Sequence, residues 1–255
     1  MQHFPPLIKF ALVNAITSIV KPLPLIYLLS IFSYLSCTDS ETARNKNVNP
    51  AEIYFDYKIR GEEKDSDVTV YLQFKVGGPN GTTIFLTDPA KVELDGEPIP
   101  VDSAKRTGAY YEIRMLAKGF EGKHSILFTG LDNEEYREDF VYKPFRLKTK
   151  IPSIIDRGDI VFDIDGLEAE DYLRVSLIDT SFRSRDINEI DTVKNGRLII
   201  PADKLKNLVD GPITVLLYKD VEKPVKDGTK AGGRIVVSYG LQREFELRPP
   251  PDLPQ

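Results

Sequence analysis

Three aspartates near the middle of the chain have the spacing of a cation site. Asp159, Asp163 and Asp165 share a parity, so they lie on one face of a predicted strand that ends at a turn. Carboxylate oxygens gathered at a strand end are the ligands that Ca²⁺ prefers. The remaining positions of an EF-hand loop are missing, and an outward polar face explains the same residues. We therefore expect no cofactor, with calcium at these aspartates as the weaker alternative.

The sequence has few groups for nucleophilic catalysis. Cys37 is the only cysteine, and the two histidines are His3 and His124. A serine or cysteine nucleophile needs a neighbouring base, usually histidine. His124 begins a predicted strand on the parity of its apolar residues, which is typical of a rim position. No G-x-S-x-G, H-E-x-x-H or phosphate-binding glycine loop is present. We expect no enzymatic activity; a hydrolase that uses paired carboxylates is the alternative, since such pairs need no histidine.

Three tyrosines fall on the polar face of the predicted strands. Tyr54, Tyr71 and Tyr110 lie opposite the apolar alternation of their segments. Aromatic rings on a rigid sheet stack on sugars or pack against a partner protein. Strand propensity also enriches tyrosine, and the chain has no tryptophan, which weakens a glycan-binding interpretation. These three residues are the predicted partner-binding face.

The first 36 residues have the parts of a secretion signal. They contain no Asp or Glu, carry Lys9 and Lys21, and end in an apolar run over residues 23–36 directly before Cys37. A positive flank, an apolar core of roughly 7–15 residues and a small residue before the cut define such a signal. Prolines and Lys21 interrupt the apolar length, so neither run reaches the ~20 residues of a membrane-spanning helix. A retained membrane anchor is the alternative.

The segment that ends in Ser36-Cys37 resembles a bacterial lipoprotein signal, in which the cysteine carries lipid and becomes the first residue of the mature protein. The resemblance implies cleavage after residue 36, acylation of Cys37 and export to the cell envelope. Two acyl chains hold a protein stably on a bilayer. Asp39 and Glu41 resemble the acidic residues that direct some lipoproteins to the cell surface, so the outer membrane is the expected location.

Charge narrows the class of partner. The 34 basic residues less Lys9 and Lys21 leave 32, against 39 acidic ones, for a mature net charge of about −7. This balance disfavours nucleic acid and anionic membrane surfaces as direct partners. We expect the membrane, through the lipid anchor, and an envelope protein or polysaccharide as partners.

Alternation with period two dominates the chain from residue 53 onward. Residues 53–59 and 68–76 place apolar side chains on one face and polar ones on the other. Such segments are predicted to be half-buried antiparallel strands. Asp95-Gly96 predicts a two-residue hairpin turn, because both positions tolerate positive φ. Only residues 202–209 have helical spacing, which predicts a short helix.

A basic segment over residues 143–152, with a proline near each end, predicts a domain boundary. Each half then has about 100 residues and six or seven short strands, which is typical of a β-sandwich. We expect a signal peptide at 1–36, a lipidated tether at 37–50, and sandwiches at 51–146 and 147–255. The second sandwich includes the short helix and an extended proline-rich tail. The architecture resembles tandem immunoglobulin or fibronectin domains; one larger barrel is the alternative.

The sequence predicts an anchor, a tether and rigid β modules, while recognisable catalytic motifs are missing. We therefore expect an all-β, membrane-anchored envelope lipoprotein that is a non-enzymatic binding or assembly module for a protein or polymer. The alternatives are the carboxylate-based hydrolase and a purely structural spacer.

Overall fold

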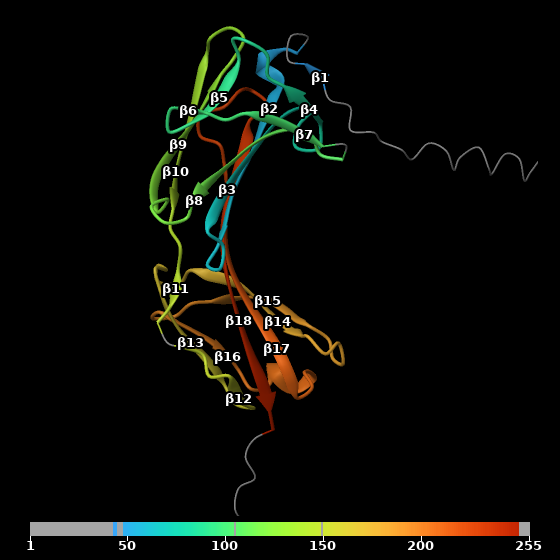
Figure 1. Cartoon of the computed structure of the whole chain (residues 1–255), viewed down its shortest axis with the longest axis vertical. Helices are drawn as coiled ribbons and strands as arrows, with labels where there is room; N and C mark the ends of the chain where they lie inside the picture. Colours follow the sequence, from blue (N-terminus) through green and yellow to red (C-terminus); the bar gives the residue numbers. More distant parts are fainter. Residues whose placement is uncertain (1–42, 45–47, 105, 149, 250–255) are drawn as a thin grey trace, which may run out of the picture. The chain divides into compact units, whose positions relative to one another are not determined.

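The structure is a computed structural model that describes residues 43–44, 48–104, 106–148 and 150–249. These residues are nearly all in strands and connecting loops, with two short 3₁₀ helices, η3 (Pro50–Glu52) and η4 (Lys204–Asn207) (Figure 1). The all-β prediction is confirmed. Cys37, the predicted signal peptide and the last six residues lie outside the described part of the chain. No helix within the described residues is both long and apolar enough to span a membrane.

The strands form one large sheet and two small ones. The large sheet contains β1 (Ala43–Arg44), β2 (Ile53–Glu62), β3 (Asp67–Val76), β4 (Thr82–Phe85), β7 (Val101–Ala104), β8 (Gly108–Leu116), β12 (Ile154–Asp156), β14 (Tyr172–Asp179), β15 (Ile187–Thr192), β17 (Gly211–Pro224) and β18 (Gly233–Arg248). Its main path runs β1-β4-β3-β2-β18-β17-β14-β15.

The two small sheets each cover part of the large one (Figure 1). One has the order β10-β9-β5-β6 and is built from β5 (Lys91–Leu94), β6 (Glu97–Pro98), β9 (Gly122–Thr129) and β10 (Glu135–Tyr142). The other has the order β11-β13-β16, from β11 (Arg146–Leu147), β13 (Ile160–Asp165) and β16 (Arg197–Ile200). The described strands form open sheets and not the single barrel of the alternative prediction.

Two hydrophobic cores lie between these layers. In the first, aromatic rings from β2, β3 and β9 pack together: Phe74 lies 5.6 Å from Phe55 and 4.8 Å from Phe128, centroid to centroid. In the second, residues of β13 and β16 such as Phe162 and Leu198 are buried against β14, β17 and β18. Each core thus has the two-sheet composition of a β-sandwich.

The hairpin β17–β18 takes part in both cores. Its tip half pairs with β2, in parallel from Gly233↔Phe55 to Gly240↔Glu62. In the other half of the hairpin, β17 pairs with β14, and this pairing ends at Tyr218. Accordingly β18 buries Ile235 in the first core and Leu241 and Phe245 in the second. The chain passes from one core to the other near the predicted boundary, and this hairpin then returns to the first.

Two local predictions can be compared with the structure. Asp95 and Gly96 have φ of 52° and 89°, and Leu94 pairs with Glu97, so the predicted two-residue turn is confirmed. The helix expected over residues 202–209 is the shorter 3₁₀ turn η4. Its N–H groups bond three residues back, and the chain becomes extended at Leu208, so no α-helical turn forms.

Gly240 permits a close approach between β18 and a side chain of β17. A Cβ at Gly240 would lie 2.2 Å from Cε1 of Tyr218, whose hydroxyl donates to Glu62 at 3.2 Å. Gly240→Ala is expected to displace this ring and lower the free energy of unfolding by about 1–3 kcal/mol. Urea denaturation checks this. Gly158→Ala, which meets nothing nearer than 4.0 Å, is the control and should change stability by less than about 0.5 kcal/mol. Equal stability of the two variants would contradict the prediction.

Candidate functional site

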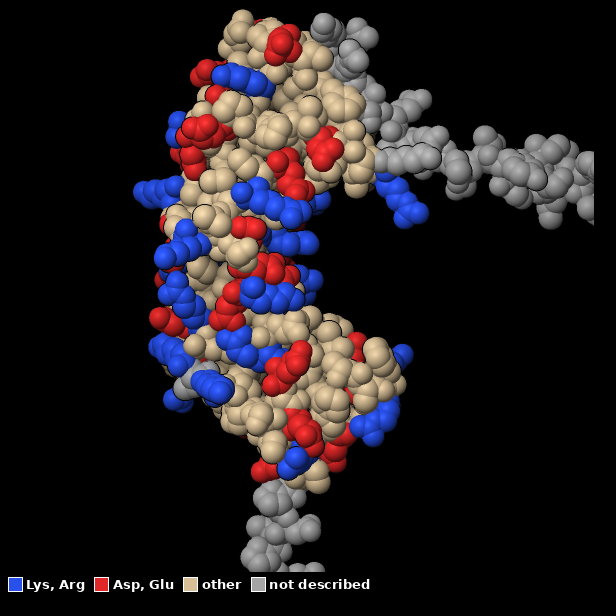
Figure 2. All heavy atoms as spheres, viewed as in Figure 1, with Lys and Arg blue, Asp and Glu red and all other residues tan. Residues whose placement is uncertain are grey.

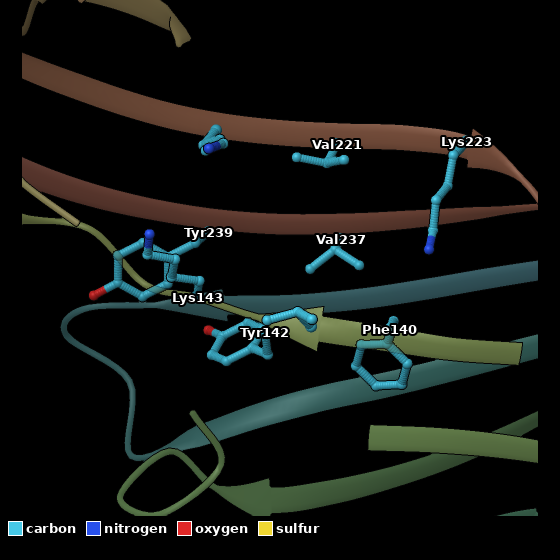
Figure 3. A pocket seen from close by; sticks show the side chains of 9 residues that line it. Phe140, Tyr142, Lys143, Val221, Lys223, Val237 and Tyr239 are labelled. Atoms are coloured by element: carbon cyan, nitrogen blue, oxygen red, sulfur yellow. The ribbon is translucent and has the colours of Figure 1, made fainter. Parts of the chain in front are cut away.

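The first sandwich is open along one side, where two strand edges lie uncovered. β10 is the edge of its four-stranded sheet, and β17 has no neighbour on its outer side after it leaves β14 at Tyr218. A groove of about 280 Å³ lies between them (Figure 3). Its lining comes from β10, β17, β18 and the residue after β10: Phe140, Val141, Tyr142, Lys143, Lys219, Val221, Lys223, Val237 and Tyr239.

The groove has an apolar floor made by the inner face of the large sheet. Val221 of β17 pairs with Val237 of β18, and Tyr239 is the next inward residue of β18. Inward side chains of β10, Phe140 and Tyr142, contribute from the opposing sheet (Figure 3). Val221 has the parity of the buried β17 residues and yet is 43% exposed. The interior of the sandwich is therefore accessible from this side.

The backbone of β10 is partly unpaired along the groove. The N–H of Arg137 donates to Asp227 Oδ2 at 2.9 Å, and the carbonyl of Asp139 accepts from Lys223 Nζ at 3.3 Å. Backbone groups of alternate residues in an antiparallel strand point to the same side. Val141 therefore also directs its N–H and carbonyl away from β9, and within the described residues neither group has a hydrogen-bond partner.

A buried carboxylate sets the end of the open edge. Glu138 of β10 is 1% exposed and accepts from the N–H of Lys226 at 2.7 Å. Its other oxygen forms an ion pair with Lys223 Nζ at 3.2 Å. These contacts hold the segment between β17 and β18 against the first half of β10 and leave the second half, from Asp139 to Tyr142, uncovered.

The lysines around the groove have acidic partners. Lys143 lies 2.7 Å from Glu168, whose hydrogen bond raises the pKa of Lys143. Lys219 lies 2.5 Å from Asp171. The third rim lysine pairs with the buried carboxylate of β10 described above. The rim charges are thus compensated, and the groove does not act as a concentrated positive site.

The polar side-chain groups of the groove lining are lysine ammonium groups and tyrosine hydroxyls. Burial raises the pKa of Tyr142 and of Tyr239, so both hydroxyls stay protonated and neutral near pH 7. The lining residues include no carboxylate, histidine, serine or cysteine. A serine–histidine or cysteine–histidine pair and a pair of carboxylates are therefore not among the residues that line the groove.

The structure brings together two of the three predicted face tyrosines. Tyr71 and Tyr110 stack at 5.1 Å between ring centroids with an interplanar angle of 22°, and Lys58 Nζ lies 5.9 Å from the Tyr71 ring. Tyr110 also donates to Asp102 at 3.1 Å, which raises the pKa of Tyr110. Tyr54 shares the face but contacts neither ring among the described residues. The aromatic cluster on this face is therefore a stacked pair of tyrosines on β3 and β8.

Asp56 of β2 lies on this same outer face and is nevertheless 1% exposed. Lys75 Nζ approaches its Oδ2 at 2.5 Å, and Arg234 Nε approaches its Oδ1 at 2.9 Å. Burial alone raises the pKa of Asp56, but the hydrogen bonds from Arg234 and Lys75 outweigh burial and lower it below its ordinary value. This carboxylate is ionised and fixed by cations, which indicates a structural role.

Both ring nitrogens of His124 have polar partners within the first sandwich. Its Nδ1 lies 2.7 Å from Asp95 Oδ2, and its Nε2 lies 2.8 Å from the carbonyl oxygen of Phe120. The ring stacks on Phe120 at 3.9 Å. Both nitrogens are occupied, in agreement with the rim position expected from the sequence.

The three predicted calcium ligands do not form a cation site in the described structure. Asp159 accepts from the N–H of Ala202 at 2.9 Å, and Asp163 accepts from Arg197 at 3.0 Å. Asp165 is exposed at the end of β13. Within the described residues, no group of three or more His, Cys, Asp or Glu side chains is arranged to hold a metal ion. The shared face of these aspartates is used for hydrogen bonds and solvent.

A loop held by side-chain hydrogen bonds follows β14, and it was not among the features predicted from the sequence. Asp179 is 1% exposed; one of its oxygens accepts from the hydroxyl and N–H of Ser181, and the other accepts from the N–H groups of Arg183 and Ser184 and from the Ser184 hydroxyl. These bonds, the Ser181 hydroxyl foremost, hold the pKa of Asp179 well below its usual range. Phe182 sits at the turn with φ 57° and is 90% exposed. Aspartate followed by serine two residues later is the signal that predicts such a turn.

Comparison with known protein families found no match, and comparison with curated proteins found none either. Among solved structures, a tetra-tandem repeat from the extending region of a large adhesion protein is 10% identical with a TM-score of 0.23. The match covers 76% of this chain and 49% of that one, so the chain spans about half the length of that structure. The two-domain structure DIP-gamma IG1+IG2 is 10% identical with a TM-score of 0.22, over 73% of this chain and 94% of that one.

A third similar structure is the Bacteroides ovatus mixed-linkage glucan utilization locus protein SGBP-B in complex with a mixed-linkage heptasaccharide. It is 12% identical with a TM-score of 0.18, over 78% of this chain and 60% of that one. At these TM-scores the similarities support no conclusion about the function of this chain.

Proposed function

We propose that the chain is an exported lipoprotein, held in the outer membrane through acylated Cys37, whose β-sandwiches bind a protein or polymer of the cell envelope without catalysis. The observation that carries the proposal is the open groove of the first sandwich. It combines an accessible apolar floor with an uncovered strand edge, and no carboxylate, histidine, serine or cysteine is among the residues that line it. Such exposed apolar surface on a rigid scaffold marks an interaction site.

Surface charge supports a partner other than nucleic acid. Figure 2 shows Lys and Arg side chains interspersed with Asp and Glu on the face in view, without one large basic field. Nucleic-acid binding relies on clustered Lys and Arg that neutralise phosphates. The acidic balance of the sequence and this distribution agree on a protein or neutral polymer as the partner.

The anchor and the site are tested separately. Mass spectrometry of the mature N-terminus is expected to find acyl chains on Cys37 and no residues before it. A photo-crosslinking residue at Val221, in the groove floor, is expected to give a defined adduct in intact cells. The same residue at Ile199, 47% exposed on β16, should give none. An unmodified Cys37 would refute the anchor, and equal labelling at both positions would refute the groove.

The stacked pair on β3 and β8 favours polysaccharide as a second candidate ligand. The two rings stack on each other, and sugar rings stack on aromatic faces of the kind that the outer side of such a pair presents. In affinity electrophoresis through envelope polysaccharide, Tyr110→Ser is expected to lose retardation that Tyr54→Ser retains. Retardation that is the same in both variants and the parent would exclude this surface.

A further inference from the structure

We infer that the groove binds an extended polypeptide segment, which adds as a strand along the second half of β10. The inference rests on the proposed binding function and names the class of ligand at that site. It follows from the backbone of β10, from the shape of the floor and from the position of the two strand edges.

Val141 directs its backbone N–H and carbonyl away from β9, at the open edge of β10. Its outward N–H and carbonyl are a donor and an acceptor spaced for a neighbouring strand, and strand edges of this kind are templates for pairing. Asp139 offers a second pair of groups two residues earlier. Lys223 covers the Asp139 carbonyl at 3.3 Å but also pairs with Glu138 at 3.2 Å. Lys223 therefore keeps its ion pair with Glu138 when its hydrogen bond to the Asp139 carbonyl is broken. The edge of β10 can be freed for pairing without leaving the lysine charge unpaired.

The spacing of side chains along a strand determines which of them would face the groove floor. Alternate side chains of a strand point to the same side and are spaced by roughly 6.6 Å. A strand on β10 would direct every second side chain onto the Val221 and Val237 surface and the others to solvent. The volume of about 280 Å³ is at the lower limit of small-molecule sites, roughly 300–1,000 Å³, and suits a few apolar side chains.

The length of the two open strand edges and the charges at their rim indicate what kind of segment would bind. Both open edges are short, from Asp139 to Tyr142 on β10 and from Lys219 to Pro224 on β17. The rim lysines are already paired, so a strongly acidic segment gains little. The preferred occupant is a short, uncharged segment with apolar residues at alternate positions, such as a β-rich partner or a chain end supplies.

The test uses the mature protein and a fluorescent heptapeptide of alternating threonine and valine, read by fluorescence anisotropy. Two isomers are compared with it, one N-methylated at its valines and the other at its threonines. N–H groups of successive residues point to opposite edges of a strand, so all valine N–H groups face one edge and all threonine N–H groups the other; strand addition predicts that one isomer loses at least about tenfold in affinity while the other binds. Equal binding of both isomers would overturn the inference in favour of a pocket for side chains alone.

Variants of Val141 separate the backbone from the side chain. Val141 is 55% exposed and points away from the core, so Val141→Pro removes the N–H without changing the floor. It is expected to weaken binding of the unmodified peptide about tenfold, whereas Val141→Thr, which keeps the N–H, is expected to weaken it much less. Urea midpoints of both variants check that the fold is retained, and weakening by Val141→Thr equal to that by proline would contradict strand addition.

The outcomes also distinguish this inference from the proposed function. Absence of peptide binding to the parent protein, together with a crosslink at Val221, would overturn strand addition and leave a polymer-binding groove. Peptide binding that Val221→Glu abolishes supports both, because a charge in the apolar floor opposes the ligand in either case. Absence of peptide binding and of any crosslink at Val221 would refute the groove as a site.

Discussion

Phe74→Ala is expected to lower the free energy of unfolding by about 4 kcal/mol, since it removes a fully buried ring from the middle of the first core. The Phe74 ring lies 4.8 Å from Phe128 and 5.5 Å from Tyr111, centroid to centroid, and neighbouring rings cannot collapse freely into the space it leaves. Urea denaturation measures the loss. Leu116→Ala, at a residue 70% exposed on β8, is the control and should cost less than about 0.5 kcal/mol.

The same experiment reports on coupling between the cores. The hairpin β17–β18 contributes to both, and Tyr239 packs against both clusters. We therefore expect one cooperative transition that Phe74→Ala and Leu198→Ala, the latter in the second core, each move to lower denaturant. Two transitions, each sensitive to one variant, would show that the cores unfold independently.

Asp56→Ala is expected to cost about 3 kcal/mol, because it leaves Lys75 and Arg234 beside a site from which water is largely excluded. Removal of one member of a buried ion pair is costly since the remaining charge has no partner. Glu246→Ala, whose carboxylate is 51% exposed and pairs with Arg248, is the matched control and should cost less than about 1 kcal/mol. Similar losses in both variants would refute the structural role of Asp56.

The pKa of Asp56 also gives the direction of the pH dependence. The folded-state pKa is lowered, so the unfolded chain takes up the proton first as the pH falls. The stabilisation is complete above the unfolded pKa of about 3.9 and is lost as the pH falls through the lower folded value. Between pH 5 and pH 2, the parent protein is therefore expected to lose more stability than Asp56→Ala, as measured by urea midpoints. A parallel decline in both would contradict this.

Local patterns predicted much of the strand content. The alternation at Ile53–Ile59 and Val68–Val76 corresponds to β2 and β3, and the Asp95-Gly96 turn is as expected. Parity alone also placed Tyr71 and Tyr110 on one face. It did not separate Tyr54 from them, because the distance between residues on neighbouring strands depends on register, which is set by partners far away in the sequence.

The groove could not be predicted in the same way. Val221 and Phe140 are 81 residues apart, and each has the pattern of an ordinary core residue in its own strand. Whether such a residue is covered by the opposing sheet depends on where that sheet ends. The extent and strand order of a sheet are set by the topology of the whole chain and not by one strand. The return of the β17–β18 hairpin to the first core could not be predicted from local sequence for the same reason. Its parallel pairing with β2 joins residues 233–240 to residues 55–62, which are far apart in the sequence.

That parallel pairing has a mechanical consequence. β2 begins at Ile53 in the first sandwich and β18 ends at Arg248 in the second, so tension applied between these two points pulls the two neighbouring strands in opposite senses along their length. The eight residue pairs from Gly233↔Phe55 to Gly240↔Glu62 are then loaded in shear, and their hydrogen bonds share the force instead of unzipping one after another. Shear of this kind is the loading in which paired strands resist separation best, so the pairing of β2 with β18 is expected to resist a pull applied between Ile53 and Arg248.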